Sequence, residues 1–477
     1  MELEAKDNSL GYYIAIVVII LMAVGTVFVF SAAANVSFDI ELQKLYDLSS
    51  LRQILFFPLA VIVMYALSRV DYRRFGLTGD LLKSPTTYLL GISIALLVLV
   101  LIPKIGVEIN QARRWFHIRL GFMTLSFQPS ELAKWAVLFF AVGFCDRFRD
   151  SIRQFWKRFV PLCAIIAVPV GLILIEDFGT AALISLLAFL ILLIGGAKRA
   201  HLFAPLPFGA AAFVAALFQS PHRLQRIAAF LNPEKWADSV AYQANQSLIA
   251  LGSGGVFGKG IGRGICKYGH LPEDTTDFIF AIIGEEFGLI GTLAVIMLFV
   301  IFVLLGIRLV VKCQDGYGRL LAAGIVLAIA TQAALNIGVV TVVLPTKGLP
   351  LPFVSAGGTS MLLTAAAVGV LINIARQATA NSEMAATQDS TLEISVSAAN
   401  DRGAVEQSLI TKDAEPAAAG EQRRILIREY KKMQASPAEK SLEFDAAGKK
   451  YQQEDAGPLK TDQLQELSKI AKRLARK

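Results

Sequence analysis

Asp277 is the residue with the clearest chemical potential in the sequence. It stands where a stretch rich in glycine and basic residues meets a strongly apolar run, in the segment Thr275-Thr276-Asp277-Phe278-Ile279-Phe280. A carboxylate placed there is a reasonable general base, because it can accept a proton from a reacting hydroxyl group. Aspartate is also a preferred N-cap of the helix that would follow. Position alone supports both interpretations.

Basic residues gather in two segments outside the apolar runs, 104–128 and 219–277. They are Lys104, Arg113, Arg114 and Arg119 in the first segment, and Arg223, Arg226, Lys235, Lys259, Arg263 and Lys267 in the second. Clustered cations favour an anionic ligand such as a phosphate or diphosphate. Ordinary loop charge is the alternative interpretation, because acidic residues that could pair with them are near: Glu108, Glu234, Asp238, Glu273 and Asp274.

Two segments have backbones suited to unusual conformations. Residues 252–264 read Gly-Ser-Gly-Gly-Val-Phe-Gly-Lys-Gly-Ile-Gly-Arg-Gly, which permits positive φ and close approach of amide groups to an anion. No GK[ST] closes this run, so it is no Walker loop, and a flexible connection is the alternative. Residues 344–358 hold three prolines and three glycines. They predict a rigid re-entrant turn that lines a cavity and places Lys347 in it.

Charged residues also lie at or within the apolar runs, where ionisable groups are costly and usually functional or mutually paired. Glu285 and Glu286 follow Asp277 by about two helical turns. Glu131 and Lys134 are three residues apart, so a helix places both on one face. For this second pair, structural pairing and a part in catalysis both remain open.

The elements that must position these residues are membrane helices. Of 477 residues, 55% are hydrophobic and 18% are charged, which is unlike a soluble domain of this size. At this hydrophobicity, helices rather than barrel strands satisfy the backbone. Ten apolar runs of spanning length are found at 11–34, 53–68, 86–103, 129–145, 159–175, 178–196, 202–218, 278–310, 319–343 and 358–376.

The short loops between alternate spans carry the Lys and Arg residues that set orientation. They include Arg69, Arg73 and Arg74, then Arg147 to Arg158, then Lys198 and Arg199, then Lys312 and Arg319. Their side is predicted to be cytoplasmic, which places both termini inside. Residues 1–10 are acidic, whereas a signal peptide begins with basic residues. The N-terminus is therefore not expected to be a cleavable signal.

The chain is therefore predicted to consist of three parts. A cytoplasmic N-terminus, 1–10, precedes a transmembrane domain, 11–376, whose loop 219–277 is large and extracytoplasmic. A cytoplasmic tail, 377–477, is predicted to be largely disordered. Its end, 464–474, repeats apolar residues at helical spacing among basic ones, so it predicts either a helix that binds anionic lipid or a partner, or a frayed tail.

The cysteines and acidic residues mark no metal site. Cys145, Cys163, Cys266 and Cys313 include no CxxC pair and no His/Cys cluster, so a zinc site is not expected. On the predicted topology, Cys266 alone faces outward, and a lone thiol builds no disulfide framework.

Taken in order, the motifs resemble the SEDS family of bacterial cell-wall proteins across residues 11–376. The carrying segments are Asn110-Gln111-Ala112-Arg113-Arg114-Trp115, Phe127-Gln128-Pro129-Ser130-Glu131-Leu132-Ala133-Lys134, Asp177-Phe178-Gly179-Thr180, Arg226 with Phe230 and Pro233, Tyr242-Gln243, Ser247-Leu248, Gly252 to Gly255, Gly258-Lys259-Gly260, Leu271-Pro272-Glu273, Thr276 to Phe280, Gly284 to Gly288, Asn336 to Val340, and Pro345-Thr346-Lys347-Gly348 through Gly358. The Pro-Thr-Lys-Gly and Gly-Glu-Glu motifs are more similar to the cell-division branch than to the elongation branch, and a sporulation paralogue of the cell-division type is the alternative. Gln111, Glu176 and Ala356 depart from the usual pattern, and none of them replaces the principal acid or basic groups.

The resemblance implies an all-α polytopic fold of SEDS type, with the large extracytoplasmic loop between helices 7 and 8. It implies a glycosyltransferase that polymerises lipid II into glycan strands during cell division, with inversion and release of undecaprenyl diphosphate. Asp277 is then the expected base. Substrate-binding residues are expected at Arg113, Arg114, Glu131, Lys134, Arg226, Gln243, Ser247, Lys259, Glu273, Lys347 and Ser355. A lipid II flippase and a non-catalytic divisome scaffold are the alternatives.

The same resemblance also implies the partners, the cofactors and the location of the protein. The expected partners are lipid II, the nascent glycan strand, a class B penicillin-binding protein transpeptidase, other divisome proteins and membrane lipids, with no nucleic acid. No cofactor is certain; a divalent cation, Mg or Mn, would assist, but no cluster of carboxylates marks its site. The expected location is the bacterial cytoplasmic (inner) membrane at the division septum.

Overall fold

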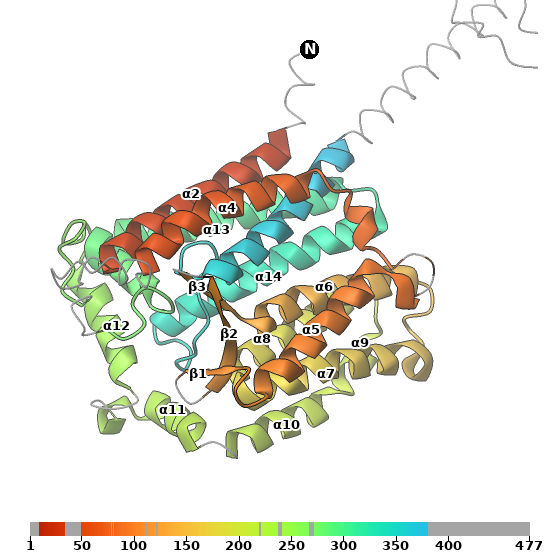
Figure 1. The fold of residues 1–477 in the computed structure, drawn as a ribbon, viewed down its shortest axis with the longest axis horizontal. Helices are drawn as coiled ribbons and strands as arrows, with labels where there is room; N and C mark the ends of the chain where they lie inside the picture. The colour runs from red at the N-terminus through yellow and green to blue at the C-terminus, as the bar shows by residue number, and fades with distance from the viewer. Residues whose placement is uncertain are drawn as a thin grey trace, which may run out of the picture. The chain divides into compact units, whose positions relative to one another are not determined.

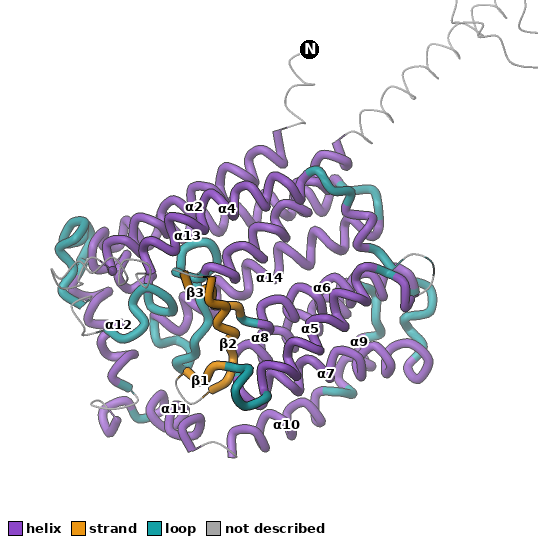
Figure 2. The backbone as a smooth tube through the Cα atoms, in the orientation of Figure 1, coloured by secondary structure: helices purple, strands orange, loops and turns teal. Residues whose placement is uncertain are grey.

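The described part of the chain is built almost entirely of helices, as Figures 1 and 2 show. The computed structural model describes residues 9–33, 49–77, 79, 81–109, 112–120, 123–218, 221–236, 241–266 and 271–379. The chain divides into two compact units, Met1–Ser382 and Glu383–Lys477, and the described residues all belong to the first. Most of the predicted tail, including its terminal apolar repeat, lies outside the described residues.

Most of the helices follow the predicted apolar runs, whereas two of them, Pro221–Leu231 and Tyr242–Ser253, lie in the predicted loop 219–277. The helices are α2 (Ser9–Ala33), α4 (Ser49–Ser68), α5 (Pro85–Leu101), α6 (Pro129–Arg147), α7 (Val160–Glu176), α8 (Phe178–Ile194), α9 (Arg199–Phe203), α10 (Leu206–Phe218), α11 (Pro221–Leu231), α12 (Tyr242–Ser253), α13 (Ile279–Lys312), α14 (Gly316–Val340) and the helix Gly358–Thr379. Short turns are η1 (Tyr72–Phe75), η2 (Leu81–Lys83), η3 (Phe155–Phe159) and η4 (Pro233–Trp236).

Six helical segments within the described residues are long and apolar enough to cross a membrane, and shorter apolar helices accompany them. The multi-pass membrane fold is thereby confirmed. The seventh predicted span, 202–218, is broken: α9 ends at Phe203 and α10 begins at Leu206, with Pro205 between them. Proline lacks the amide hydrogen that would continue the helical ladder, which explains the break.

The helix α13 is longer than a bilayer requires, and a glycine divides it. Gly288 has φ 64° and ψ −158°, far outside helical values. The part after this kink, 289–312, is close to the length of about 20 residues that spans the hydrocarbon. The part before it, 279–287, carries Glu285 and Glu286, whose side chains are buried at 0% and 1% exposure. The kink therefore separates a short segment that carries two buried carboxylates from a long apolar spanning segment.

The helices form a bundle in which α13 and α6 are central. Helix α13 packs against α14, α2 and α12, while α6 packs against α5, α8 and α14. Nearly all of α6 is buried, including both of its charged residues near the start. In Figure 1 the described chain begins and ends at the same end of the bundle. A Cβ atom at Gly11 would lie 3.4 Å from the Ala375 side chain, which agrees with that view.

A small sheet, which the sequence did not indicate, occupies the segment between α5 and α6. It is antiparallel in the order β1 (Val107–Ile109), β2 (Ala112–Leu120) and β3 (Met123–Phe127). In the register, Glu108 faces Arg113 and Phe116 faces Phe127, with an irregularity after Val107. The sheet holds Arg113 and Arg114 on a fixed strand (Figure 2), so these cations are not on a loose loop.

The glycine run 252–264 packs its backbone on the kink of α13. The amides of Lys259 and Gly260 donate to the carbonyl groups of Glu285 and Glu286, at 3.0 and 2.9 Å. Gly258 has φ 77°, and a Cβ atom there would lie 2.2 Å from the Glu286 carbonyl oxygen. Glycine is required because the two backbones touch. The amides of Lys259 and Gly260 therefore have hydrogen-bond partners and are not available to an anion. The run is packed against α13 and is not a flexible connection.

Candidate functional site

Asp277 lies in a loop that neighbouring segments hold by its main chain. The Nδ2 atom of Asn336 donates to the Asp277 carbonyl oxygen at 2.8 Å. The hydroxyl of Ser355 donates to the Thr276 carbonyl, and the Ala356 amide donates to the Thr275 carbonyl at 2.9 Å. Three successive carbonyl groups are therefore fixed. The N-cap position of α13 belongs to Phe278, and no side chain caps that helix, so the N-cap interpretation of Asp277 is wrong.

The Asp277 carboxylate is half-buried and chemically free. Within the described residues it accepts no hydrogen bond from a side chain or an amide. A Cβ atom at Gly348 would lie 2.9 Å from its Oδ2 atom, so only glycine leaves room for the carboxylate there. Burial raises the pKa of Asp277 to about 7, helped by the charges of Glu273 and Asp177 and opposed by those of Arg226 and Arg114. Such a group can exchange a proton near neutral pH.

Three of the predicted cations surround this carboxylate and its neighbour Asp177. Arg226 on α11 has its pKa lowered by burial and by Arg114, while Asp277 and Asp177 oppose that shift. Burial also lowers the pKa of Lys347, and Asp177 opposes it. The Lys347 ammonium lies 4.9 Å from the centre of the Phe178 ring. Arg114, Arg226 and Lys347, which are far apart in the sequence, thus converge on one region.

Arg114 has an unused donor in this region. One of its Nη atoms lies 3.6 Å from Oδ2 of Asp177, and the other donates to the Glu176 carbonyl group. Its Nε atom is buried and has no hydrogen-bond partner in the described part of the chain. A buried donor without a partner is unfavourable, so a bound acceptor would stabilise it. Arg113, its neighbour, forms an ion pair with Glu108 at 3.1 Å instead.

Asp177 belongs to the site but was not among the predicted site residues. It caps α8, because its Oδ1 accepts from the Thr180 amide at 3.0 Å and its Oδ2 accepts from the Thr180 hydroxyl at 2.9 Å. Asp177 is therefore an N-cap of α8, whereas α13, which follows Asp277, has no side-chain cap. The Asp177-Phe178-Gly179-Thr180 motif could have indicated this residue from the sequence. A charged residue between two apolar spans is costly, so it usually has a functional or structural role.

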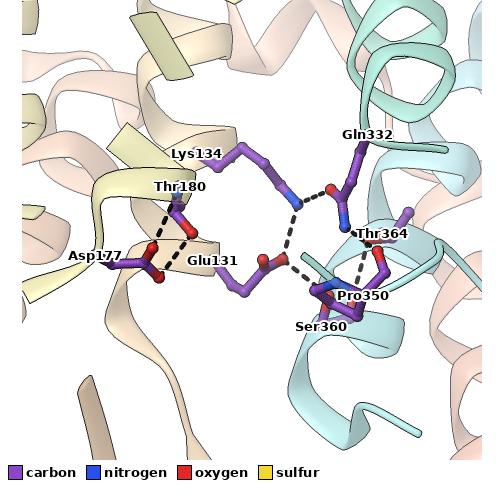
Figure 3. A network of polar contacts seen from close by, with 8 residues as sticks. All are labelled: Glu131, Lys134, Asp177, Thr180, Gln332, Pro350, Ser360 and Thr364. Carbon is purple, nitrogen blue, oxygen red and sulfur yellow. Dashed lines mark hydrogen bonds and ion pairs between the residues drawn. The ribbon is translucent and has the colours of Figure 1, made fainter. Parts of the chain in front are cut away.

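Glu131 and Lys134 form a buried ion pair within a polar network (Figure 3). The Lys134 ammonium donates to Glu131 and to the Gln332 side-chain oxygen, both at 2.8 Å. The Ser360 hydroxyl donates to Glu131 at 2.9 Å. Gln332 in turn donates to the Pro350 carbonyl group at 2.9 Å. The structure therefore favours the pairing interpretation, with the network joining α6, α14 and the helix Gly358–Thr379.

Gln332 and Asn336, one helical turn apart on α14, were also missed as site residues. Gln332 holds the Pro350 carbonyl group, while Asn336 holds those of Leu349 and Asp277. Both side chains are buried, at 3% and 1% exposure. One face of α14 thus fixes the Lys347 segment and the Asp277 loop relative to each other. Uncharged amides inside an apolar span were the available signal.

The other predicted substrate-binding residues have contacts that the fold explains. The Lys259 ammonium lies 2.7 Å from Glu285, and the buried Ser247 hydroxyl donates to the Val340 carbonyl at 2.7 Å. Ser355 is 4% exposed and joins two loops, as described above. Glu273, at φ 57°, accepts from the Thr276 hydroxyl at 2.9 Å, and Gln243 is half-buried on α12. The charge of Glu273 also raises the pKa of Asp277.

No ready-made metal ligand set is found in the described ranges, where no group of three or more His, Cys, Asp and Glu side chains could hold an ion. The four cysteines are free thiols, and burial raises the pKa of Cys266 to about 11. The chemistry available at Asp277 is thus proton transfer by one carboxylate beside several cations. That combination suits a reaction in which a hydroxyl group attacks and a diphosphate leaves.

Comparisons with known proteins identify the family. Residues 12–380 match the cell cycle protein family of FtsW, RodA and SpoVE. Stage V sporulation protein E of Bacillus subtilis is 36% identical over 377 residues, which cover 78% of this chain and 99% of that protein. The probable peptidoglycan glycosyltransferase FtsW of Coxiella burnetii is 36% identical over 373 residues, covering 77% and 96%.

Two solved structures share the fold at 26% sequence identity. One belongs to a peptidoglycan synthase complex that coordinates polymerization and crosslinking; it has a TM-score of 0.60 and covers 77% of this chain and 98% of that chain. The other is the rod shape determining protein RodA of Thermus thermophilus, with a TM-score of 0.53 and coverage of 76% and 95%.

Proposed function

The chain belongs to the FtsW, RodA and SpoVE family of cell cycle proteins, the SEDS family that its motifs resemble, and we propose that it is a peptidoglycan glycosyltransferase acting on lipid II. The observation that carries this proposal is the half-buried Asp277 carboxylate, with its pKa raised to about 7, beside Arg114, Arg226 and Lys347. Relatives named as probable peptidoglycan glycosyltransferases support it.

In the proposed reaction, a sugar hydroxyl of one substrate attacks the anomeric carbon of the other. Asp277 accepts the hydroxyl proton as the new glycosidic bond forms. The bond from the anomeric carbon to the diphosphate oxygen breaks, and undecaprenyl diphosphate leaves with the bonding electron pair. Single displacement inverts an α-linked donor to a β-linked polymer. Because diphosphate is a competent leaving group, one carboxylate suffices where a typical glycosidase uses two.

The cations are proposed to stabilise the charge that develops on the diphosphate. Arg114 offers its unpartnered Nε donor, and Arg226 and Lys347 approach from α11 and from the segment after α14. Partial desolvation strengthens such contacts. We further propose that the protein acts in septal wall synthesis in the inner membrane, with both termini cytoplasmic and a class B penicillin-binding protein as partner. The solved synthase complex supports that pairing.

Product analysis with purified protein tests the proposal. The full chain is supplied with labelled lipid II, with and without the transpeptidase partner, and products are resolved by length. Glycan strands of several lengths are expected. If lipid II crosses vesicle membranes and no polymer forms under either condition, the protein is a flippase. If neither activity is detected with the partner present, it is a scaffold.

The polymerisation rate is expected to rise with pH through about 7 and to level off above it. The base must be ionised, and burial raises the pKa of Asp277 to about 7, so kcat/KM should fall about tenfold per pH unit below that value. Initial rates between pH 5.5 and pH 8.5 test this. Glu273→Gln removes a charge that raises the pKa of Asp277, so the midpoint should move to lower pH. A rate independent of pH in this range would rule out Asp277 as the titrating base.

Asn336→Leu is expected to lower kcat by about 10- to 100-fold with little change in KM. The substitution removes both hydrogen bonds that fix the Asp277 and Leu349 carbonyl groups, so the base loses its position. Thr341→Val is the matched control, because the Thr341 hydroxyl donates only to carbonyls of its own helix. Equal losses in both variants would show general damage to α14 rather than loss of positioning.

A further inference from the structure

A pocket of about 640 Å³ lies at the end of the bundle opposite Asp277. It is lined where α6, α8 and α13 end and where α14 begins, whereas Asp277 precedes the start of α13 and Asp177 caps the start of α8. This end carries the loop basic residues and is the one proposed to be cytoplasmic. None of the residues of the candidate site lines this pocket.

Three arginines line the pocket, and the charge of one of them, Arg149, acts on the Asp146 carboxylate. Arg149 and Arg153 lie in the connection after α6, and Arg319 lies in the first turn of α14. All three are exposed. In the part of the chain that the structure describes, none of them forms an ion pair or a side-chain hydrogen bond. Each of these guanidinium groups can therefore donate to a bound anion without first breaking a contact within the described residues.

The other polar groups of the pocket leave an excess of positive charge. Asp146 and Asp150 also line it, so three arginines face two aspartates. Beside the pocket, the Asp315 carboxylate caps the N-terminus of α14 by accepting from the Gly318 amide at 2.9 Å. A Cβ atom at Gly316 would lie 3.2 Å from Nη1 of Arg149 and 3.4 Å from Oδ1 of Asp146. A side chain at position 316 would therefore crowd the Arg149 guanidinium and the Asp146 carboxylate, which glycine avoids.

One wall of the pocket is apolar. Ile194, Val310, Leu320 and Ala323 supply it, and Ile194 is 46% exposed. A lining that holds both arginines and aliphatic side chains suits a ligand with a charged group and an attached organic part. Guanidinium binds phosphate through paired hydrogen bonds, which makes phosphate the anion that best fits this lining.

We propose that this pocket binds a phosphate-bearing anion, which is either the headgroup of an acidic phospholipid of the inner leaflet or a soluble phosphate ester. The proposal is independent of the reaction at Asp277, because it uses other residues at the opposite end of the bundle. Bound there, the anion would tie the connection after α6 to the start of α14.

Lipid retention by the full chain tests the first source. The protein is placed in nanodiscs of phosphatidylcholine with a minor share of phosphatidylglycerol, extracted in mild detergent, and analysed for lipid that stays bound. The pocket variant is R153Q/R319Q. The matched control is R74Q/R199Q, which removes two exposed arginines from the same end, outside the pocket lining. Phosphatidylglycerol retention is expected to fall about tenfold in the pocket variant and to remain in the control.

Equilibrium dialysis with radiolabelled inorganic phosphate tests the second source on the same proteins. Binding by wild type and control that is lost in R153Q/R319Q would identify a soluble phosphate ligand. Ala323→Leu fills the pocket without changing charge, so it should also abolish whichever binding is found. The proposal is overturned if the pocket variant and the charge-matched control lose equal amounts of both ligands, or if neither ligand binds the wild type.

Discussion

Asp277→Asn is expected to abolish glycan polymerisation, with a loss of about 10²- to 10⁴-fold in kcat, while lipid II still binds. The amide has the shape of the carboxylate but cannot accept the hydroxyl proton, so a base is lost and the site is kept. Product length and lipid II binding are measured on the same preparation. Asp274→Asn, three residues earlier in the same loop, is the matched control and should keep activity within a few-fold.

The same substitution is expected to stabilise the fold above neutral pH. Because burial raises the pKa of Asp277 to about 7, the folded protein holds a proton that the unfolded chain releases near pH 4. Stability therefore falls as pH rises between these two values, and the ionised form carries the full cost above them. We expect Asp277→Asn to gain about 2 kcal/mol at pH 8, with the gain vanishing toward pH 4.

Thermal unfolding at pH 8 and at pH 4 distinguishes two causes of lost activity. One is loss of the catalytic base, and the other is damage to the structure of the Asp277 loop. If the variant is inactive but more stable than wild type at pH 8, Asp277 is the base and its ionised form destabilises the fold. An inactive variant that is less stable would show that Asp277 holds the loop instead. Retained polymerisation would remove Asp277 from the mechanism altogether.

Lys134→Met is expected to lower the free energy of unfolding by about 3–5 kcal/mol. The substitution leaves the buried Glu131 carboxylate without its counter-charge, although the Ser360 hydroxyl still donates to it. The double variant E131Q/K134M removes both charges and should recover most of the loss. Chemical unfolding in detergent measures the difference. A single variant as stable as wild type would return the pair to the catalytic interpretation.

Hydropathy was sufficient to predict the helices, because each spanning run must satisfy its own backbone. The sheet of residues 107–127 was not predictable in the same way, since its short strands are stabilised by one another and by contacts with α5, α6 and α7 that are distant in the sequence. The glycine run was misjudged for a related reason. Its partners are the carbonyl groups of Glu285 and Glu286, and nothing in the local sequence indicates which backbone a glycine will touch.

The candidate site was predictable in its charged residues but not in their grouping. Asp277, Arg114, Arg226 and Lys347 stood out as charges near apolar runs. Lys259 stood out for the same reason, yet its partner is the buried Glu285. Asp177 and Arg114 are far apart in sequence and meet only because β2 lies beside the end of α7. The distance between two charged side chains depends on the tertiary fold, and it cannot be read from a single sequence.

The Asp277 loop is held through carbonyl groups of Thr275, Thr276 and Asp277, and this has a consequence for evolution and engineering. A main-chain acceptor is present whatever side chain the residue carries, so the anchorage does not depend on the identity of Thr275 or Thr276. The donors Asn336 and Ser355 have no such freedom, because they hold the Asp277 and Thr276 carbonyls through their side chains, whereas Ala356 holds the Thr275 carbonyl through its amide. Sequence drift in the loop should therefore be tolerated, whereas its two supports should be intolerant of change.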